Sequence, residues 1–143
     1  MIKQLLSAFA AASFVAACSS EPPPPQPQPQ PAAQATSFMV FFDWDRSNIS
    51  AQAQSTIAQA ANTFKQTGAA RLTATGHADR SGPDNYNMAL SLRRANTVKD
   101  ALVRDGVPAT AISVVGMGEK GLLVPTADGV REPQNRRVEI VLQ

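Results

Sequence analysis

Polar side chains in the middle of the chain have types and spacing that suit the binding of a small charged molecule. Asp79 lies just after a strand-like segment. Asn87, Ser91 and Arg94 follow at positions i, i+4 and i+7, which share one face of a helix whose start lies beside Asp79. A carboxylate and a guanidinium that converge across an amide suit a zwitterion, because each pairs with the opposite charge. The same spacing fits an internal Asp79–Arg94 salt bridge that only orders the loop, and the residues alone favour neither alternative.

Catalytic chemistry has little support in the sequence. His77 is the only histidine, and no nucleophile lies in a recognisable elbow that it could activate. The segment Gly116-Met117-Gly118 lacks the spacing of a nucleotide-binding loop. Asp43 and Asp45 could belong to a calcium loop, but the glycine and glutamate of an EF-hand are missing. We therefore expect no enzymatic activity, no cofactor and no metal site.

Four segments have the patterns of β-strands. Residues 38–42 form a continuous apolar run, and residues 71–77 alternate between polar and apolar types. Residues 112–115 and 137–142 complete the set. Residues 117–134 contain several glycines and prolines and are expected to form a loop.

Two helices are predicted between these strands. The first follows a candidate N-cap at Ser50, ends near Gly68, and has one apolar face formed by Ile57, Ala60, Ala61 and Phe64. The second is expected to begin at a capping Asp84 and to end at Gly106. Its predicted apolar stripe, largely distinct from the polar face, consists of Met88, Leu92, Ala95, Val98 and Leu102. The order β-α-β-α-β-β predicts an α/β sandwich with both helices on one face of the sheet.

The N-terminal segment has the pattern of an export signal. Lys3 supplies a positive charge, and the apolar stretch that follows is too short to span a bilayer stably. The stretch ends in Val15-Ala16-Ala17-Cys18, which resembles a bacterial lipobox, and Cys18 is the only cysteine. The resemblance implies removal of residues 1–17 and acylation of Cys18, so that lipid would anchor the mature protein. The alternative is a plain secretory signal with an incidental cysteine.

A tract rich in proline and glutamine separates Cys18 from the globular part. Residues 18–37 include four consecutive prolines, which cannot enter a helix or a central strand. We expect an extended polyproline II spacer, with a reach of roughly 50 Å over residues 21–37 at about 3.1 Å per residue. Ser19 stands where an aspartate often retains lipoproteins in the inner membrane, so the sequence implies outer-membrane sorting. One domain is expected over residues 38–143.

Composition narrows the range of partners. The formal net charge of the chain is +2, and it falls to +1 once Lys3 is removed with the leader. The chain has no basic run and only 6% aromatic residues, so we do not expect it to bind a nucleic acid. No segment after the leader is long and apolar enough to cross a membrane.

Four motifs connect the chain to a known family. They are Thr75-Gly76-His77-Ala78-Asp79, the segment 86–96 that begins Tyr-Asn-Met-Ala-Leu-Ser, Gly116-Met117-Gly118-Glu119, and Asn135-Arg136-Arg137-Val138-Glu139-Ile140. In their order and separations they resemble the OmpA-like C-terminal domain family, which includes peptidoglycan-associated lipoproteins. The resemblance spans nearly all of residues 38–143 and implies a mixed four-stranded sheet. It also implies non-covalent binding of the peptide stem of peptidoglycan through meso-diaminopimelate.

The resemblance also implies which residues contact that ligand: Asp45, His77, Ala78, Asp79, Asn87 and Arg94. Asp79 would pair with the ammonium of diaminopimelate and Arg94 with its carboxylate. His77 and Ala78 would line the pocket, partly through backbone groups. Of the pair Arg136-Arg137, one arginine is expected to pack against Glu119 or the loop 117–134.

Three functions are considered for this sequence. The favoured one is an outer-membrane lipoprotein whose domain faces the periplasm and tethers the membrane to peptidoglycan. The alternative is an interaction protein that docks periplasmic partners, such as a Tol-type propeller, during envelope constriction. A cell-wall hydrolase would need an acid–base pair or a metal that the sequence does not offer.

Overall fold

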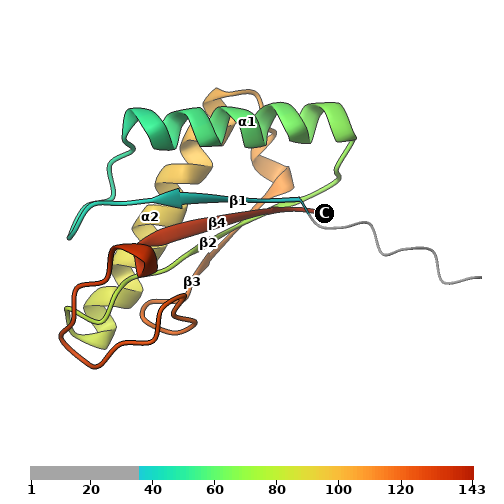
Figure 1. The fold of residues 1–143 in the computed structure, drawn as a ribbon. Helices are drawn as coiled ribbons and strands as arrows, with labels where there is room; N and C mark the ends of the chain where they lie inside the picture. The colour runs from blue at the N-terminus through green and yellow to red at the C-terminus, as the bar shows by residue number, and fades with distance from the viewer. Residues whose placement is uncertain (1–35) are drawn as a thin grey trace, which may run out of the picture. The chain divides into compact units, whose positions relative to one another are not determined.

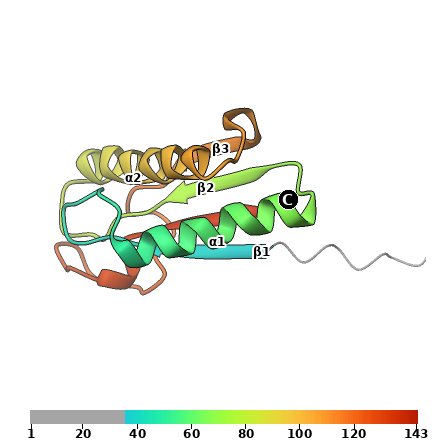
Figure 2. The ribbon, with the colours of Figure 1, turned by 90° about the horizontal axis from the view of Figure 1, so that it is seen from above.

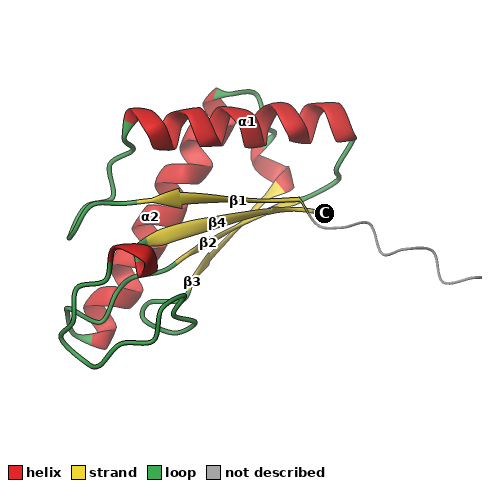
Figure 3. Cartoon of the chain, in the orientation of Figure 1, coloured by secondary structure: helices red, strands yellow, loops and turns green. Residues whose placement is uncertain are grey.

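Four strands form one mixed sheet in the order β1-β4-β2-β3 in the computed structural model, which describes residues 36–143 (Figures 1 and 3). The strands are β1 (Thr36–Phe41), β2 (Leu72–Gly76), β3 (Ile112–Gly116) and β4 (Arg137–Leu142). β4 is antiparallel to both β1 and β2, whereas β2 and β3 are parallel. The predicted mixed four-stranded α/β sandwich is therefore confirmed.

The two predicted helices cover one face of this sheet. They are α1 (Ala51–Thr67) and α2 (Asp84–Arg104), and two short 3₁₀ turns, Ala109–Ala111 and Pro133–Asn135, precede β3 and β4. Figure 2 shows α1 over β1 and β4, with α2 beside β2 and β3. Neither α1 nor α2 is long and apolar enough to cross a membrane.

The predicted signal peptide and Cys18 fall on residues 1–35, which lie outside the described residues, as does most of the predicted linker. β1 begins at Thr36, inside the segment that the sequence assigned to the linker.

Local signals explain the limits of α1. The side chain of Ser50 accepts a hydrogen bond of 3.1 Å from the backbone N–H of Ala53, as expected of an N-cap. Gly68 ends the helix in the left-handed conformation, with φ of 67°. Both boundaries agree with the sequence prediction.

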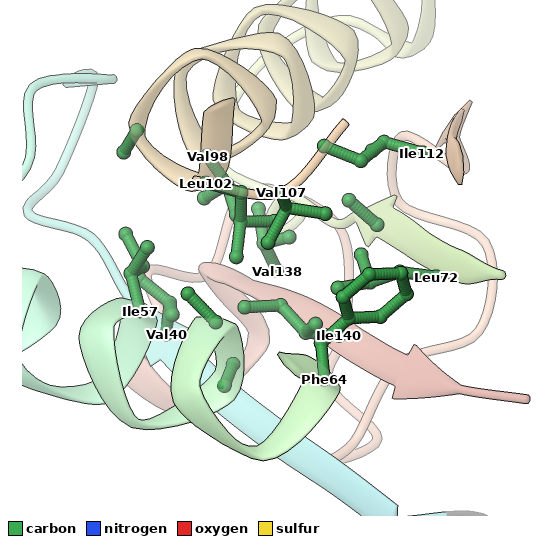
Figure 4. Packing of buried hydrophobic residues seen from close by; sticks show 14 of the residues in the cluster. Val40, Ile57, Phe64, Leu72, Val98, Leu102, Val107, Ile112, Val138 and Ile140 are labelled. Atoms are coloured by element: carbon green, nitrogen blue, oxygen red, sulfur yellow. The ribbon is translucent and has the colours of Figure 1, made fainter. Parts of the chain in front are cut away.

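The core lies between the two helices and the sheet and includes the inward side chains of the strands (Figure 4). Alternate residues of each strand point inward, as the period of a strand requires. The large buried side chains labelled in Figure 4 are Val40, Ile57, Phe64, Leu72, Val98, Leu102, Val107, Ile112, Val138 and Ile140, and Phe42 and Leu142 belong to the same cluster. This packing makes the sheet a rigid support for the loops at its ends.

The predicted start of α2 and the first part of its apolar stripe need correction, whereas Ala95, Val98 and Leu102 are buried as predicted. Asp84 is the first helical residue rather than the cap, because the carbonyl of Pro83 already accepts the N–H of Asn87 at 2.9 Å. Leu92, predicted to be buried, is 44% exposed, and Met88 is only partly buried. The inward face of the N-terminal half consists instead of Asn87, Leu90, Ser91 and Arg94.

Two glycines at strand ends, Gly76 and Gly116, explain why the small polar residue Ser91 faces the sheet from α2. A Cβ atom on Gly76 would lie 1.9 Å from the carbonyl oxygen of Ser91, and one on Gly116 would lie 3.2 Å from the Ser91 hydroxyl. The backbone of α2 therefore approaches the sheet too closely for a large side chain. The Ser91 hydroxyl uses the position to accept the N–H of Gly118 at 2.8 Å.

The strand directions gather the functional loops at one edge of the sheet. The C-terminal ends of β1, β2 and β3 meet the start of β4 at this edge. Figure 1 shows the connecting loops together at the left of the molecule, while the chain's C-terminus lies at the opposite edge. Residues far apart in the sequence are therefore neighbours at the loop edge.

Candidate ligand-binding site

A pocket of about 250 Å³ opens among these loops. Its walls come from the β1–α1 loop, the β2–α2 loop, α2 and Arg136, which directly precedes β4. The lining residues are Trp44, Asp45, Asp79, Ser81, Gly82, Pro83, Tyr86, Asn87, Leu90, Arg94 and Arg136. The structure thus brings together four of the six predicted ligand residues: Asp45, Asp79, Asn87 and Arg94.

The carboxylate of Asp79 is almost completely buried, with 3% of the residue exposed. Its Oδ1 accepts from both the backbone N–H and the hydroxyl of Ser81, at 3.2 and 2.5 Å. Its Oδ2 accepts from the Glu132 amide and from Arg136 Nη1, each at 3.2 Å. Burial alone would raise the pKa of Asp79, but the bonds from Ser81, Arg136 and Glu132 outweigh it and hold that pKa below its ordinary value. Asp79 is therefore a stable negative charge in the pocket wall.

The guanidinium of Arg94 is fully buried and anchors the two neighbouring loops. Nε donates to the carbonyl of Arg46 at 2.8 Å. Nη1 donates to the carbonyl of His77 and Nη2 to that of Asp43, each at 3.1 Å. Since an arginine has five N–H groups, one remains on each terminal nitrogen. Burial lowers the pKa of Arg94 to about 10, so the group stays charged at neutral pH.

Asp79 pairs with Arg136 rather than with Arg94, so the internal Asp79–Arg94 salt bridge is not formed. Arg136 also donates from Nε to the carbonyl of Phe42 at 3.1 Å. Among the lining residues that the sequence did not predict, Arg136 is the charged one. The signal was present in the Asn135-Arg136-Arg137 motif, but only the fold brings it against Asp79.

The other arginine of that motif packs as expected against the loop 117–134. Arg137 Nη2 donates to the carbonyl of Gly121 at 3.1 Å, and Arg137 also pairs with Glu139. Glu119, the alternative partner, instead accepts a bond of 2.9 Å from Asn87 and lies 3.6 Å from Arg80.

Asn87 and Asp45 occupy different depths of the pocket. Asn87 is 2% exposed and donates to the carbonyl of Gly82 and the carboxylate of Glu119. These bonds connect α2 to the β2–α2 loop and to the loop 117–134. Asp45 lies at the exposed rim, where the Tyr86 hydroxyl donates to its carboxylate. Its backbone is left-handed, with φ of 55°, a conformation that aspartate tolerates better than most residues.

His77 and Ala78 do not line the pocket. The His77 ring is buried against the loop 117–134, with Nδ1 lying 3.3 Å from the carbonyl of Lys120. The amide of Ala78 donates to Gly118, and the carbonyl of His77 accepts from Arg94. Their backbone groups therefore support the pocket from behind.

The charges around the pocket balance. Asp45 and Asp79 contribute two carboxylates, and Arg94 and Arg136 contribute two guanidinium groups. Such a wall suits a ligand that carries both an ammonium and a carboxylate. Within residues 36–143, no three His, Cys, Asp or Glu side chains are grouped closely enough to hold a metal ion.

Known proteins share both the sequence and the fold. The model of the OmpA family matches residues 41–136. An outer membrane protein of Gluconacetobacter diazotrophicus is 49% identical over 114 residues, which cover 76% of this chain and 30% of that protein. A peptidoglycan-associated lipoprotein of Agrobacterium fabrum is 36% identical over 103 residues, which cover 72% of this chain and 58% of that protein. The chain therefore spans about a third of the length of the first relative and about three fifths of the second.

A solved structure extends the likeness to three dimensions. The crystal structure of the peptidoglycan-associated lipoprotein from Burkholderia pseudomallei has a TM-score of 0.68 and 30% identity to this chain. The match covers 74% of this chain and 90% of that one. The family model, the sequence relatives and the shared fold together show that the chain belongs to the OmpA family.

Proposed function

We propose that the pocket binds meso-diaminopimelate in the peptide stem of peptidoglycan, without covalent chemistry. The observation that carries the proposal is Arg94, which is fully buried in the pocket wall with two N–H groups left on its terminal nitrogens. A ligand carboxylate placed there receives a charge-assisted, two-pronged grip. Asp79 lines the same pocket and provides a negative charge for the ligand ammonium.

We further propose that the chain tethers the outer membrane to the cell wall through a lipid on Cys18. The lipobox-like segment 15–18 supports the lipid anchor, and the relatives named peptidoglycan-associated lipoproteins support the association with the wall. The fold suits this role, because Thr36 pairs with Leu142 at the edge of the sheet opposite the loops that line the pocket. A linker that joins the domain at Thr36 therefore enters at the edge away from the pocket.

Co-sedimentation with purified sacculi tests the proposal. The wild-type chain should pellet with diaminopimelate-type sacculi, release no soluble fragments, and pellet poorly with lysine-type sacculi, since lysine lacks the second carboxylate. Asp79→Asn removes the buried charge at nearly constant shape and should weaken binding by roughly thirtyfold or more. Asp100→Asn, at an exposed position of α2, is the matched control and should bind like wild type.

Thermal melts of both variants must accompany the assay, so that binding is compared only where each protein is folded. Equal pelleting of wild type with both wall types, or unchanged pelleting of Asp79→Asn, would contradict the proposed site. If wild type does not pellet at all, the docking alternative gains support.

A further inference from the structure

The carboxylate of Asp79 has no vacant acceptor position in the unliganded domain. A carboxylate offers about four lone-pair positions. Four donors occupy them: the amide and hydroxyl of Ser81 on Oδ1, and the Glu132 amide with Arg136 Nη1 on Oδ2. A ligand ammonium that pairs with Asp79 must therefore replace one of these four donors.

Three of the four donors are held in place. The Ser81 amide belongs to the tight turn that follows Asp79, and the Glu132 amide belongs to the backbone of the long loop. Arg136 is charged, is fixed by a second bond from Nε to Phe42, and is costly to separate from a buried carboxylate. The Ser81 hydroxyl differs, because a change of side-chain rotamer moves its oxygen and hydrogen together away from Asp79 Oδ1.

The surroundings of Ser81 allow that change. Within residues 36–143, the other hydrogen bond to Ser81 Oγ comes from the indole N–H of Trp44, at 3.0 Å, and Trp44 is 44% exposed. Trp44 is itself held from above by Arg131, whose guanidinium carbon lies 3.6 Å from the ring centroid. Ser81 and Trp44 both line the pocket, so the released hydroxyl stays within reach of a ligand.

We propose that the Ser81 hydroxyl is the exchangeable donor of the cation subsite: it occupies Asp79 Oδ1 until a ligand ammonium replaces it and the Ser81 side chain changes rotamer within the pocket. This inference rests on the proposed function, since it names how the same site accepts its ammonium. Ser81 is a positioning residue that competes with the ligand. Its removal should therefore strengthen binding, whereas the removal of a simple contact residue would weaken it.

The test is calorimetric titration of the full chain in detergent with meso-diaminopimelate. Ser81→Ala should bind about two- to tenfold more tightly than wild type, the effect of one competing hydrogen bond. Ser81→Thr keeps the hydroxyl and should restore wild-type affinity. Ser55→Ala, on the exposed face of α1, is the matched control and should have no effect. Titration with pimelate, which has both carboxylates and no ammonium, should show no gain in Ser81→Ala.

A second readout does not depend on any ligand. Carboxyl carbon NMR should show that the pKa of Asp79 is higher in Ser81→Ala than in wild type or Ser81→Thr, because the carboxylate loses a donor. Equal or weaker diaminopimelate binding by Ser81→Ala, or an unchanged pKa of Asp79, would overturn the inference about Ser81. The proposed function would still stand in that case, provided that the wild-type chain binds diaminopimelate. If wild type itself does not bind diaminopimelate, the proposed function fails and this inference fails with it.

Discussion

The guanidinium of Arg94 uses three of its five N–H groups on the carbonyls of Asp43, Arg46 and His77. The residue therefore shapes the pocket as well as lining it. Truncation to alanine would damage both roles together, because three carbonyls would lose their donors. A substitution that keeps the charge is needed to separate ligand binding from loop support.

Arg94→Lys is that substitution. Lysine keeps a positive charge but cannot bond three carbonyls and still present two parallel donors to a carboxylate. We expect diaminopimelate binding to weaken by at least tenfold in calorimetric titrations, and the free energy of unfolding to fall by about 1–3 kcal/mol. Arg93→Lys, the exposed neighbour, should change neither quantity measurably. Tight binding by Arg94→Lys would remove Arg94 from the proposed site.

His77 should make the domain sensitive to mild acid. Burial lowers the pKa of His77 below its ordinary value of 6.5, and the charge of Arg137 lowers it further, against the opposing effects of Glu139 and the Lys120 carbonyl. The unfolded chain therefore binds a proton at a higher pH than the folded chain does. Stability is complete above about pH 6.5 and declines as the pH falls from there toward the folded pKa.

Urea unfolding of wild type and His77→Gln between pH 7.5 and about pH 5 measures this effect. Because His77 is the only histidine, the decline should vanish in the variant. The loop 117–134 should open first, since Lys120 and Gly121 are held there by His77 and Arg137. A decline of equal size in His77→Gln would place the titrating group elsewhere.

At the scale of the elements, the approach of α2 to the sheet depends on Gly76. A Cβ atom at this position would lie 1.9 Å from the Ser91 carbonyl oxygen, inside the helix backbone rather than against a movable side chain. Such a clash can be relieved only by shifting α2, which carries Asn87 and Arg94 into the pocket wall.

Gly76→Ala should therefore destabilise the domain by roughly 2–3 kcal/mol or more, measured by urea unfolding. Gly68→Ala is the matched comparison. Gly68 has φ of 67° but open space around it, so its substitution should cost only about 1 kcal/mol of left-handed strain. Equal effects of the two substitutions would show that the close approach of α2 is not what Gly76 provides.

The elements predicted well from the sequence are those with local signals. The limits and the buried face of α1 could be predicted from local signals: the N-cap Ser50, the C-terminal Gly68 and the helical spacing of Ile57 and Phe64. The inward face of the N-terminal half of α2 was predicted poorly, because it depends on glycines in two distant strands, whereas Ala95, Val98 and Leu102 are buried as predicted. The same reason hid the role of Arg136: its partner Asp79 lies 57 positions away, and only the sheet order brings them together.

The proposed function joins a wall-binding domain to a membrane anchor in one molecule. Cys18→Ser removes the only cysteine and with it the proposed site of acylation. Since each buried CH₂ contributes about 0.8 kcal/mol, several acyl chains hold a protein firmly at a membrane. We expect the variant to leave the outer-membrane fraction and to lack acyl mass at its N-terminus, as measured by fractionation and mass spectrometry. A variant that fractionates like wild type would refute the lipid anchor.

The proposed binding of a diaminopimelate zwitterion in the pocket among the loops can be tested by mapping the ligand on the domain. Backbone amide NMR of the chain, titrated with meso-diaminopimelate, provides that map. We expect saturable shifts confined to residues 43–46, 79–83, 86–94 and 132–136, and none on the exposed outer positions of β3. Shifts that cluster on another face, or no saturable shift at millimolar ligand, would contradict it.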